Sequence, residues 1–372
     1  MRIAHISDTH LGFSAYRRVD EGSGLNQREV DMYNAFQRCV DMMIDGNVEL
    51  VLHSGDLFDS VRPSNRAISF AMEQFVRLTD SGAKVIVIAG NHSTPKLRET
   101  GSVFKIFEHL KGVRPVYQGR YERIDVEDVA VHAVPHSERE TMMEELDKIE
   151  LDADSKNVLM VHTGVTGVEV KGGVEHNEQI IPDSYLRGEY DYIALGHYHE
   201  CKEVRPNARY SGSVERMSFA EAGQRKGYID LDSNKMDARV REVRTRPMFD
   251  LPFIDAKGKD PSELMSDIRA SLGSHDLDGA IVRLNVRNIT GASYRSLDFN
   301  RIRQEASKAV HFEPRFDVSA EEVSVQSNDL SFTDLDREFA TFLERFPIEG
   351  ASKDAIKAKG LEYMKRGLEG SE

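Results

Sequence analysis

The stretch Arg2-Ile3-Ala4-His5-Ile6-Ser7-Asp8-Thr9-His10 decides the fold, because a short apolar run passes directly into an Asp-x-His group. Four more runs rich in Val, Ile, Leu or Ala end in the polar groups Gly55-Asp56-Leu57-Phe58-Asp59, Gly90-Asn91-His92, His162-Thr163-Gly164 and Gly196-His197-Tyr198-His199. Such runs are typical of buried strands, so the polar groups are expected at strand ends. In an open α/β sheet these ends converge on one crevice, where ligands bind. The sequence therefore predicts one site assembled from five distant segments.

The side chains in these groups suit a pair of divalent metal ions. Two ions roughly 3.5–4 Å apart offset the charge of a phosphodiester, activate water and stabilise the departing oxygen. We expect Asp56 to bridge them, with Asp8, His10 and His199 around one ion and Asn91, His162 and His197 around the other. Mixed imidazole, carboxylate and amide ligands favour Mn²⁺, Fe²⁺ or Zn²⁺ over Mg²⁺. His92 adjoins a ligand without being needed as one, so it is expected to transfer protons.

Any one of these groups alone is more often an ordinary surface or core feature, and the ordered set carries the prediction. The set resembles the calcineurin-like metallophosphoesterases, whose pattern is D-x-H, G-D-x-x-D, G-N-H, H-x-G and G-H-x-H. Within that superfamily, His5 to Gly12, Leu52 to Phe58, Arg62-Pro63 and Tyr210-Ser211-Gly212-Ser213 are similar to the Mre-eleven/SbcD nucleases of DNA double-strand-break repair, in their archaeal form. The resemblance covers essentially the whole chain and is strongest from residue 1 to about residue 230.

The resemblance implies a Mn²⁺-dependent DNA nuclease with two metal ions per subunit, and Fe²⁺ or Zn²⁺ are the alternative metals. It also implies 3′ to 5′ exonuclease action on duplex ends and endonuclease action on single strands or hairpins. His92 would stabilise or protonate the leaving oxygen. The implied partners are DNA, a Rad-fifty/SbcC-type ABC ATPase and a second copy of the chain, so that two copies would enter a heterotetramer.

The chain departs from the family pattern at two positions. Many members carry His where Asp59 stands, and that His helps to handle the scissile phosphate. An ionised carboxylate only accepts hydrogen bonds and repels phosphate, so the phosphate-handling role of Asp59 is either lost or moved. The family usually reads G-N-H-D or G-N-H-E, and here Ser93 replaces the acid. An acid there would orient and charge His92, so Ser93 leaves both the pKa and the orientation of His92 open.

The pattern along the chain predicts an α/β metallophosphoesterase β-sandwich, with two sheets flanked by helices, over residues 1–246. Helices are expected from Asn26 to Asp45, Ser64 to Thr79 and Lys96 to Lys111. Family members dimerise through helices at the last two places, although simple core packing would give the same pattern. Residues 247–325 alternate strand and helix patterns without a metal motif, with helices expected from Pro261 to Ser271 and from Tyr294 to Val310. This pattern fits a small α/β capping domain of the family or a mere completion of the core.

Residues 326–372 are predicted to form a linker and a helical tail. Two amphipathic stretches, from Ser331 to Phe346 and from Lys353 to Leu368, are too short to bury their apolar stripes on each other. The family places such a segment on the coiled coil of the ATPase, and the alternative is that it folds back on the capping domain.

Composition sets further limits on function and location. The formal net charge is −14, which is unusual for a DNA-binding protein, but residues 96–123 hold seven basic against three acidic residues. A second basic stretch contains Lys202, Arg205, Arg209, Arg216, Arg225 and Lys226. Either stretch could contact phosphate or be a solvated face. The chain has no apolar run of 18 residues and no basic, apolar leader, and its two cysteines read as reduced thiols, so we expect a cytoplasmic protein without membrane contact.

Two other functions share the sequence features. A phosphatase or cyclic-nucleotide phosphodiesterase would use every one of the same ligands, because the ligands activate water and do not choose the substrate. A non-catalytic scaffold of the same fold is the second alternative, but such proteins typically lose the metal histidines, and here His10, His92, His162, His197 and His199 are all present.

Overall fold

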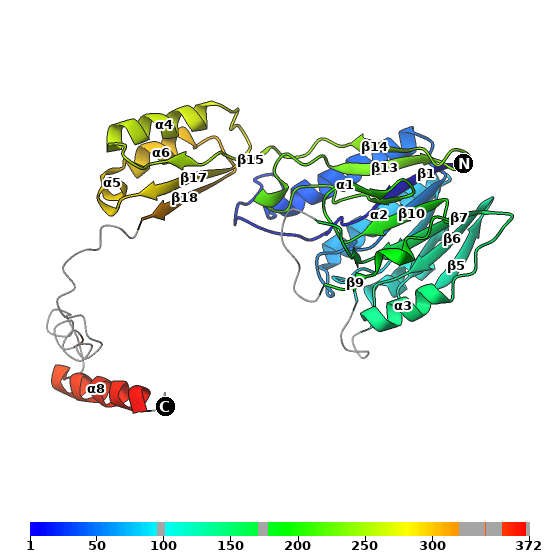
Figure 1. The fold of residues 1–372 in the computed structure, drawn as a ribbon, viewed down its shortest axis with the longest axis horizontal. Helices are drawn as coiled ribbons and strands as arrows, with labels where there is room; N and C mark the ends of the chain where they lie inside the picture. Colours follow the sequence, from blue (N-terminus) through cyan, green and yellow to red (C-terminus); the bar gives the residue numbers. More distant parts are fainter. Residues whose placement is uncertain (95–100, 170–177, 320–338, 340–351, 370–372) are drawn as a thin grey trace.

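The computed structural model describes residues 1–94, 101–169, 178–319, 339 and 352–369, and its largest part is a sandwich of two six-stranded sheets (Figure 1). The first sheet has the order β14-β13-β1-β2-β3-β4, formed by Ala238–Glu242, Gly227–Asp232, Arg2–Ile6, Leu50–His53, Lys84–Ile88 and Val113–Val116. The second has the order β11-β12-β10-β7-β6-β5, formed by Lys202–Arg205, Ala208–Tyr210, Tyr192–Gly196, Lys156–His162, Val129–Val134 and Glu122–Val126. The expected two-sheet α/β class is confirmed.

The central strands are buried on both faces, which explains their nearly continuous apolar sequences. In β1, Ile3 packs between the two sheets with residues such as Leu52 and Met160. Ala4 and Ile6 face the other way, into the layer that contains Phe36. Because successive side chains of a strand point to opposite faces, one short run serves two cores.

Helices cover the outer face of each sheet. Helices α1 (Gln27–Asp45) and α2 (Asn65–Asp80) pack on the first sheet, and α3 (Arg139–Asp147) packs on the second. Each of the first two begins where a side chain can accept an otherwise unpaired backbone N–H, Asn26 for α1 and Ser64 for α2. Both helices start within one residue of the positions expected from the sequence.

The helix expected from Lys96 to Lys111 is wrong in its described part. Residues 95–100 lie outside the described residues, and the remainder contains the 3₁₀ helix η2 (Val103–His109). A 3₁₀ helix has about three residues per turn, so Phe104 and Phe107 fall on one side and both are buried. Phe107 packs edge-to-face on Phe75 of α2, with ring centroids 5.2 Å apart.

Short elements complete the sandwich at the edge where the predicted site lies. Strands β8 (Gly164–Val165) and β9 (Ile180–Ile181) pair in parallel, and two single 3₁₀ turns are η3 (Asp183–Tyr185) and η4 (Phe219–Glu221). These pieces have little regular pattern in the sequence, and none of them was expected.

Residues from Met248 to Val318 form a separate sheet with its own apolar core. Strand β17 (Ile281–Ile289) pairs with β15 (Met248–Asp250), β16 (Ile254–Asp255) and β18 (His311–Val318). Helix α4 (Pro261–Gly273) lies on the sheet, as expected. The single helix expected from Tyr294 to Val310 is instead two, α5 (Gly291–Ser296) and α6 (Phe299–Glu305), because Asp298 caps a new start by accepting from the N–H of Arg301.

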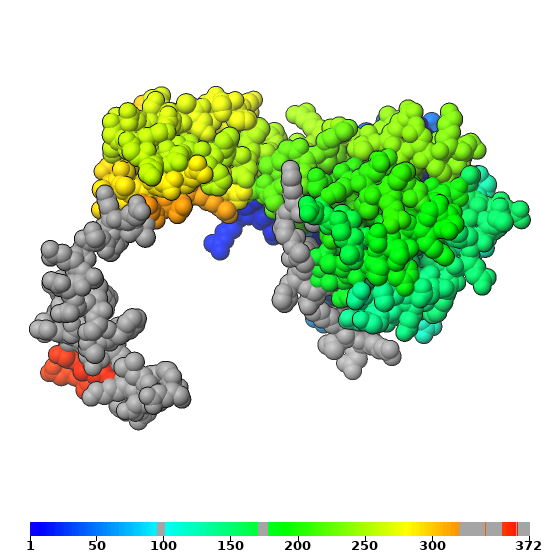
Figure 2. All heavy atoms as spheres, in the orientation of Figure 1, coloured from blue at the N-terminus to red at the C-terminus, as the bar shows by residue number. Residues whose placement is uncertain are grey.

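This second unit meets the sandwich (Figure 2). The contacts at the junction are both apolar and charged. Phe219, Met248 and Ile281 form a small buried cluster, and the ring of Tyr16 stacks on His311 with centroids 4.0 Å apart. Arg246 donates two hydrogen bonds to the carboxylate of Asp31 on α1, at 2.6 and 2.7 Å.

The tail is described only in part. The helix expected from Lys353 to Leu368 is present as α8 (Lys353–Glu369), and the one expected from Ser331 to Phe346 lies outside the described residues apart from Phe339. Among the described helices, none combines the length and the apolar character that crossing a bilayer requires. Cys39 and Cys201 are both free thiols, as expected.

A buried histidine links the two sheets of the sandwich. His5 of β1 lies 3.0 Å from the hydroxyl of Tyr192 and 3.2 Å from the carbonyl oxygen of Leu195, both on β10. Burial lowers the pKa of His5 to about 3, although the hydrogen bond to Leu195 acts in the opposite direction. His5 is therefore neutral in the folded protein at neutral pH.

This link predicts a specific acid sensitivity. Because the folded pKa of His5 lies below its ordinary value of 6.5, the unfolded chain binds one more proton between pH 6.5 and about 3, and stability falls as the pH falls through that window. His5→Gln should reduce the slope of unfolding free energy against pH there by about 1.4 kcal/mol per pH unit, the value for one proton. Urea denaturation from pH 7 to 4 measures this slope, with His275→Gln on an exposed turn as control. An unchanged slope in His5→Gln would contradict the assignment.

Candidate metal centre

The loops that follow β1 and β2 remain paired beyond the ends of the strands. The N–H of Asp8 donates to the carbonyl of Gly55 at 3.0 Å, and the N–H of His10 donates to the carbonyl of Asp56 at 3.0 Å. The two loops thus continue the parallel pairing of β1 with β2. This pairing brings the Asp-x-His group beside Asp56 despite a separation of nearly fifty residues in sequence.

Four of the predicted ligands have left-handed backbone conformations. The φ angles are 51° at Asp8, 40° at His10, 50° at Asp56 and 106° at His197. Such angles are uncommon for residues with a Cβ and cost free energy, and they gather where surrounding structure enforces them. The sharp turns lift these side chains off the strand direction and turn them toward a common centre.

Two glycines allow the approach of these loops. A Cβ at Gly196 would lie 1.8 Å from the carbonyl oxygen of Ser54, so the end of β10 could not pass the end of β2 with any larger residue. A Cβ at Gly90 would lie 2.2 Å from Oδ1 of Asp56. The glycines of the G-N-H and G-H-x-H groups therefore permit close packing and carry no chemistry themselves.

Six of the seven predicted ligands form two groups of three. Within each group, the ligand atoms lie within 4.8 Å of one another. One group is Asp8, His10 and His199, and the other is Asp56, His162 and His197. In the first, Nε2 of His10 lies 3.1 Å from Nε2 of His199. In the second, Oδ1 of Asn91 lies 2.9 Å from Nε2 of His162 and 3.2 Å from Nδ1 of His197. The structure thus brings together all seven residues expected to bind metal.

Asp56 lies between the two groups. Its Oδ1 accepts a hydrogen bond from the backbone N–H of His92 at 3.0 Å. Its Oδ2 lies 3.2 Å from Nε2 of His162 and 4.0 Å from Nε2 of His10. One carboxylate oxygen therefore faces an imidazole from each group, and this side chain is almost fully buried.

The charges of the centre favour bound cations. Burial acts to lower the pKa of His162, but the charges of Asp56 and Asp8 raise it to about 9. Burial likewise acts to raise the pKa of Asp56, but the neighbouring His162 and His10 hold it well below its ordinary range. Carboxylates that hold a proton on an adjacent imidazole would also attract a divalent ion in its place. Buried oxygen and nitrogen donors in this mixture fit such an ion.

In three of the imidazoles, the nitrogen that faces away from the centre has a partner. Nδ1 of His162 donates to the carbonyl of Ser54 at 2.8 Å, which leaves Nε2 for the centre. Nδ1 of His199 lies 3.1 Å from Glu221, and Nε2 of His197 lies 3.3 Å from Glu178. Metal-bound histidines typically have such partners, which fix the orientation of the ring.

The carboxylates of Glu221 and Glu178 were not identified from the sequence. Each lies about twenty residues along the chain from the histidine that it contacts, in a segment without a recognisable motif, so no spacing signal pointed to either. Glu221 also binds the buried ammonium of Lys226 at 2.6 Å. Burial acts to raise the pKa of Glu221, but the hydrogen bond with His199 and the charge of Lys226 lower it to about 2.

The second basic stretch is largely neutralised within the protein. Lys226 is buried against Glu221, and the exposed or half-exposed arginines Arg205, Arg209 and Arg225 pair with Asp183, Glu203 and Glu242. Arg216 donates to Thr245 and to backbone carbonyls at the junction. The hypothesis that this stretch contacts phosphate therefore loses most of its support.

His92 and Asp59 lie beside the first group. Nδ1 of His92 donates to the backbone carbonyl of Asp59 at 2.9 Å, and its ring meets that of His10 edge-on, with centroids 4.9 Å apart. The Asp59 carboxylate lies 3.4 Å from Nδ1 of His10. Ser93, the second departure from the family pattern, is buried, and its backbone N–H donates to Gly90.

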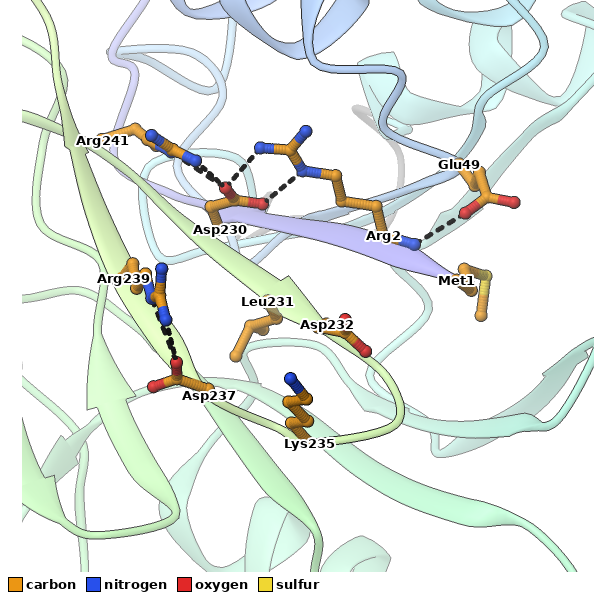
Figure 3. A pocket seen from close by; sticks show the side chains of 10 residues that line it. All are labelled: Met1, Arg2, Glu49, Asp230, Leu231, Asp232, Lys235, Asp237, Arg239 and Arg241. Atoms are coloured by element: carbon orange, nitrogen blue, oxygen red, sulfur yellow. Dashed lines mark hydrogen bonds and ion pairs between the residues drawn. The ribbon is translucent and has the colours of Figure 1, made fainter.

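A polar pocket at the opposite end of β1 is a poor candidate site. Its lining includes Arg2, Asp230, Asp237, Arg239 and Arg241 (Figure 3). Asp230 accepts from both Arg2 and Arg241, and Arg239 pairs with Asp237. Most of these charges are thus satisfied by one another, in contrast with the converging ligands at the other end of the strand.

Comparison with known proteins agrees with this geometry. Residues 1–201 match the family described as calcineurin-like phosphoesterase. Three archaeal relatives carry the name DNA double-strand break repair protein Mre11. The Methanocaldococcus jannaschii protein is 29% identical over 70% of this chain and 70% of its own length. The Sulfolobus acidocaldarius protein is 32% identical over 55% and 50%, and the Haloferax volcanii protein is 28% identical over 77% and 61%.

The pair of Glu221 and Lys226 gives a stability prediction. Glu221→Ala leaves a buried ammonium without its counter-charge, and breaking a buried ion pair in this way typically costs about 3–5 kcal/mol. The double variant Glu221→Gln with Lys226→Met removes both charges and should lose clearly less than the sum of its two single changes. Urea denaturation in the presence of EDTA measures both effects without bound metal. A loss below about 1 kcal/mol in Glu221→Ala, the range of exposed pairs, would show that the pair is not buried in solution.

Proposed function

We propose, from the premise that the chain belongs to the calcineurin-like phosphoesterase family, that this hydrolase cleaves phosphodiester bonds of DNA with two divalent metal ions. The position of Asp56 carries the dinuclear part of the proposal. Its Oδ2 faces His10 of one ligand group and His162 of the other, which is where a bridging carboxylate has to lie.

The proposed ligand shells follow the two groups. Asp8, His10 and His199 hold one ion, Asn91, His162 and His197 hold the other, and Asp56 is shared. When bound, two such ions neutralise the phosphate, supply an activated water and stabilise the leaving oxygen. Imidazole, carboxylate and amide donors suit Mn²⁺ well, and they also accept Fe²⁺ or Zn²⁺.

His92 is the proposed proton donor. The Asp59 carbonyl can only accept, so Nδ1 of His92 carries the proton of that hydrogen bond and Nε2 is the nitrogen that exchanges a proton with the leaving oxygen. The backbone N–H of His92 donates to Asp56, and this hydrogen bond fixes the position of His92 relative to the centre of the site. This anchoring replaces the acidic neighbour that Ser93 does not provide.

DNA is the proposed substrate because the archaeal relatives are named as double-strand break repair proteins. The unit from Met248 to Val318 would act as a capping domain that helps to hold the duplex. We propose 3′ to 5′ exonuclease action on duplex ends and endonuclease action on single strands or hairpins. A homodimer would form through α2 and the segment around η2. The net charge of −14 makes small phosphoesters the alternative substrate class.

A paired assay tests this function. Purified protein should release nucleotides from end-labelled duplex DNA in Mn²⁺ and should hydrolyse cyclic nucleotides or p-nitrophenyl phosphate far more slowly. His92→Gln should lower DNA cleavage by roughly 10²–10⁴, the contribution of general acid–base catalysis, without loss of bound Mn²⁺. Asp56→Asn should instead lower the occupancy of both ions, because the bridge is shared.

Any of three results would contradict part of the proposal. Preferential turnover of small phosphoesters would make the chain a phosphatase or small-molecule phosphodiesterase of the same family. Loss of a metal ion in His92→Gln would make His92 a ligand and not a proton donor. Full occupancy of either ion in Asp56→Asn would remove Asp56 as the bridge.

We also propose that the tail binds a Rad-fifty/SbcC-type ABC ATPase. Helix α8 places Tyr363 in solvent, with 61% of its surface exposed, and the sequence puts Ile356, Leu361, Met364 and Leu368 at helical spacing. An amphipathic helix of this kind suits a groove on a coiled coil.

Deleting residues 330–372 should abolish co-purification with the ATPase and leave Mn²⁺-dependent cleavage by the isolated nuclease intact, because no proposed ligand lies in the deleted part. Tagged full-length and shortened chains, each co-expressed with the ATPase, give the measurement. Full binding by the shortened chain would disprove the tail as the docking element, and loss of cleavage would show that the tail supports the catalytic unit.

A further inference from the structure

Asp59 stands where the nuclease family usually has a histidine, and its surroundings suggest a different use for the residue. Its carboxylate is directed at His10, with Oδ1 3.4 Å from Nδ1. Its backbone carbonyl accepts from Nδ1 of His92 at 2.9 Å. Its backbone N–H donates to Leu11 at 3.3 Å, which ties it to the loop that carries His10. Asp59 therefore contacts His10 through its side chain and His92 through its backbone carbonyl.

The other three ligand imidazoles each have a partner on the outer ring nitrogen, and His10 has no such hydrogen bond within the described part of the chain. His162 has the Ser54 carbonyl on its outer nitrogen, His199 has Glu221, and His197 has Glu178. Nδ1 of His10 is buried and makes no hydrogen bond to any described residue in this conformation of the side chains. Nε2 of His10 faces His199, so Nδ1 is the outer nitrogen and Asp59 occupies the position of the missing partner.

We propose that Asp59 is a positioning residue, whose carboxylate accepts the Nδ1–H of His10 and so fixes Nε2 toward the ion held with Asp8 and His199. The inference rests on the dinuclear centre proposed above. An ionised carboxylate accepts hydrogen bonds and repels phosphate, so this orientation suits Asp59 better than contact with the substrate. About a third of its side chain is exposed, at 32%, which leaves room for the small rotation that shortens 3.4 Å to a hydrogen bond.

The rival role for Asp59 is direct ligation. Ligand atoms of His10, Asp59 and His92 also lie within 4.8 Å of one another, so these three side chains could hold a third ion. The two roles predict different effects of losing Asp59. If Asp59 positions His10, its loss weakens the binding of one ion. If Asp59 is itself a ligand, its loss reduces the number of bound ions.

Mn²⁺ titration of the full-length protein, followed by calorimetry and by the electron paramagnetic resonance of free Mn²⁺, separates these roles. The wild type should bind two ions. Asp59→Ala should also bind two, one of them roughly 10–100-fold more weakly, which is the usual cost of losing an outer partner of a metal-bound histidine. Asp59→Asn keeps an acceptor oxygen and should recover part of that loss. Asp267→Ala, on α4 of the other unit, is the matched control, and thermal unfolding in EDTA checks that each variant folds.

Three outcomes would be decisive. Unchanged affinity for both ions in a folded Asp59→Ala variant would overturn the positioning role. Three ions in the wild type and two in Asp59→Ala would make Asp59 a ligand, which also overturns it. A wild type that binds fewer than two ions would instead contradict the dinuclear centre, so failure of the inference and failure of the proposed function remain distinguishable.

Discussion

The carboxylate of Asp56, held between two groups of buried imidazoles, is the constraint on which the rest of the sandwich depends. Bringing Oδ2 within 3.2 Å of His162 on the second sheet requires that the ends of β2 and β7 almost touch. Only glycine at position 196 lets β10 pass the carbonyl of Ser54 at this point. The strained backbone at Asp8, His10 and His197 is the local cost of the same convergence, and the apolar layer between the sheets offsets it.

The groups that contact the outer nitrogens of the imidazoles differ in chemistry, and this difference affects the imidazoles as ligands. A backbone carbonyl holds His162, so its orientation is set by the fold itself. Carboxylates stand behind His199 and His197, and a buried lysine further balances the one behind His199. A carboxylate makes an imidazole a stronger donor to a cation than a carbonyl does, so His197 and His199 are expected to be more basic ligands than a carbonyl partner alone would make them.

The sequence predicted the parts of the structure that repeat a simple rule. Each apolar run that passes into a polar group became a strand ending at the centre, and helices α1 and α2 start at capping residues that can be read directly. Glu178, Glu221 and Lys226 could not be predicted, because their roles arise from contacts across the fold and not from spacing. The basic stretch from Lys202 to Lys226 misled for the same reason, since a one-dimensional count of charge does not show that its cations are already paired. The long helix expected from Tyr294 failed because a single aspartate, Asp298, begins a new helix inside an otherwise continuous pattern.

The position of β1 in the middle of the first sheet has a consequence for synthesis of the chain. Its neighbours are β2 on one side and β13 on the other, and Arg2 bonds to Asp230, 228 residues later. Until β13 has left the ribosome, β1 is an open edge, and pairings of such long range form slowly. The contact between His10 and His199 likewise cannot form until His199, 189 residues further on, has been synthesised. The candidate metal centre is therefore incomplete in the nascent chain until the segment that carries His197 and His199 has left the ribosome.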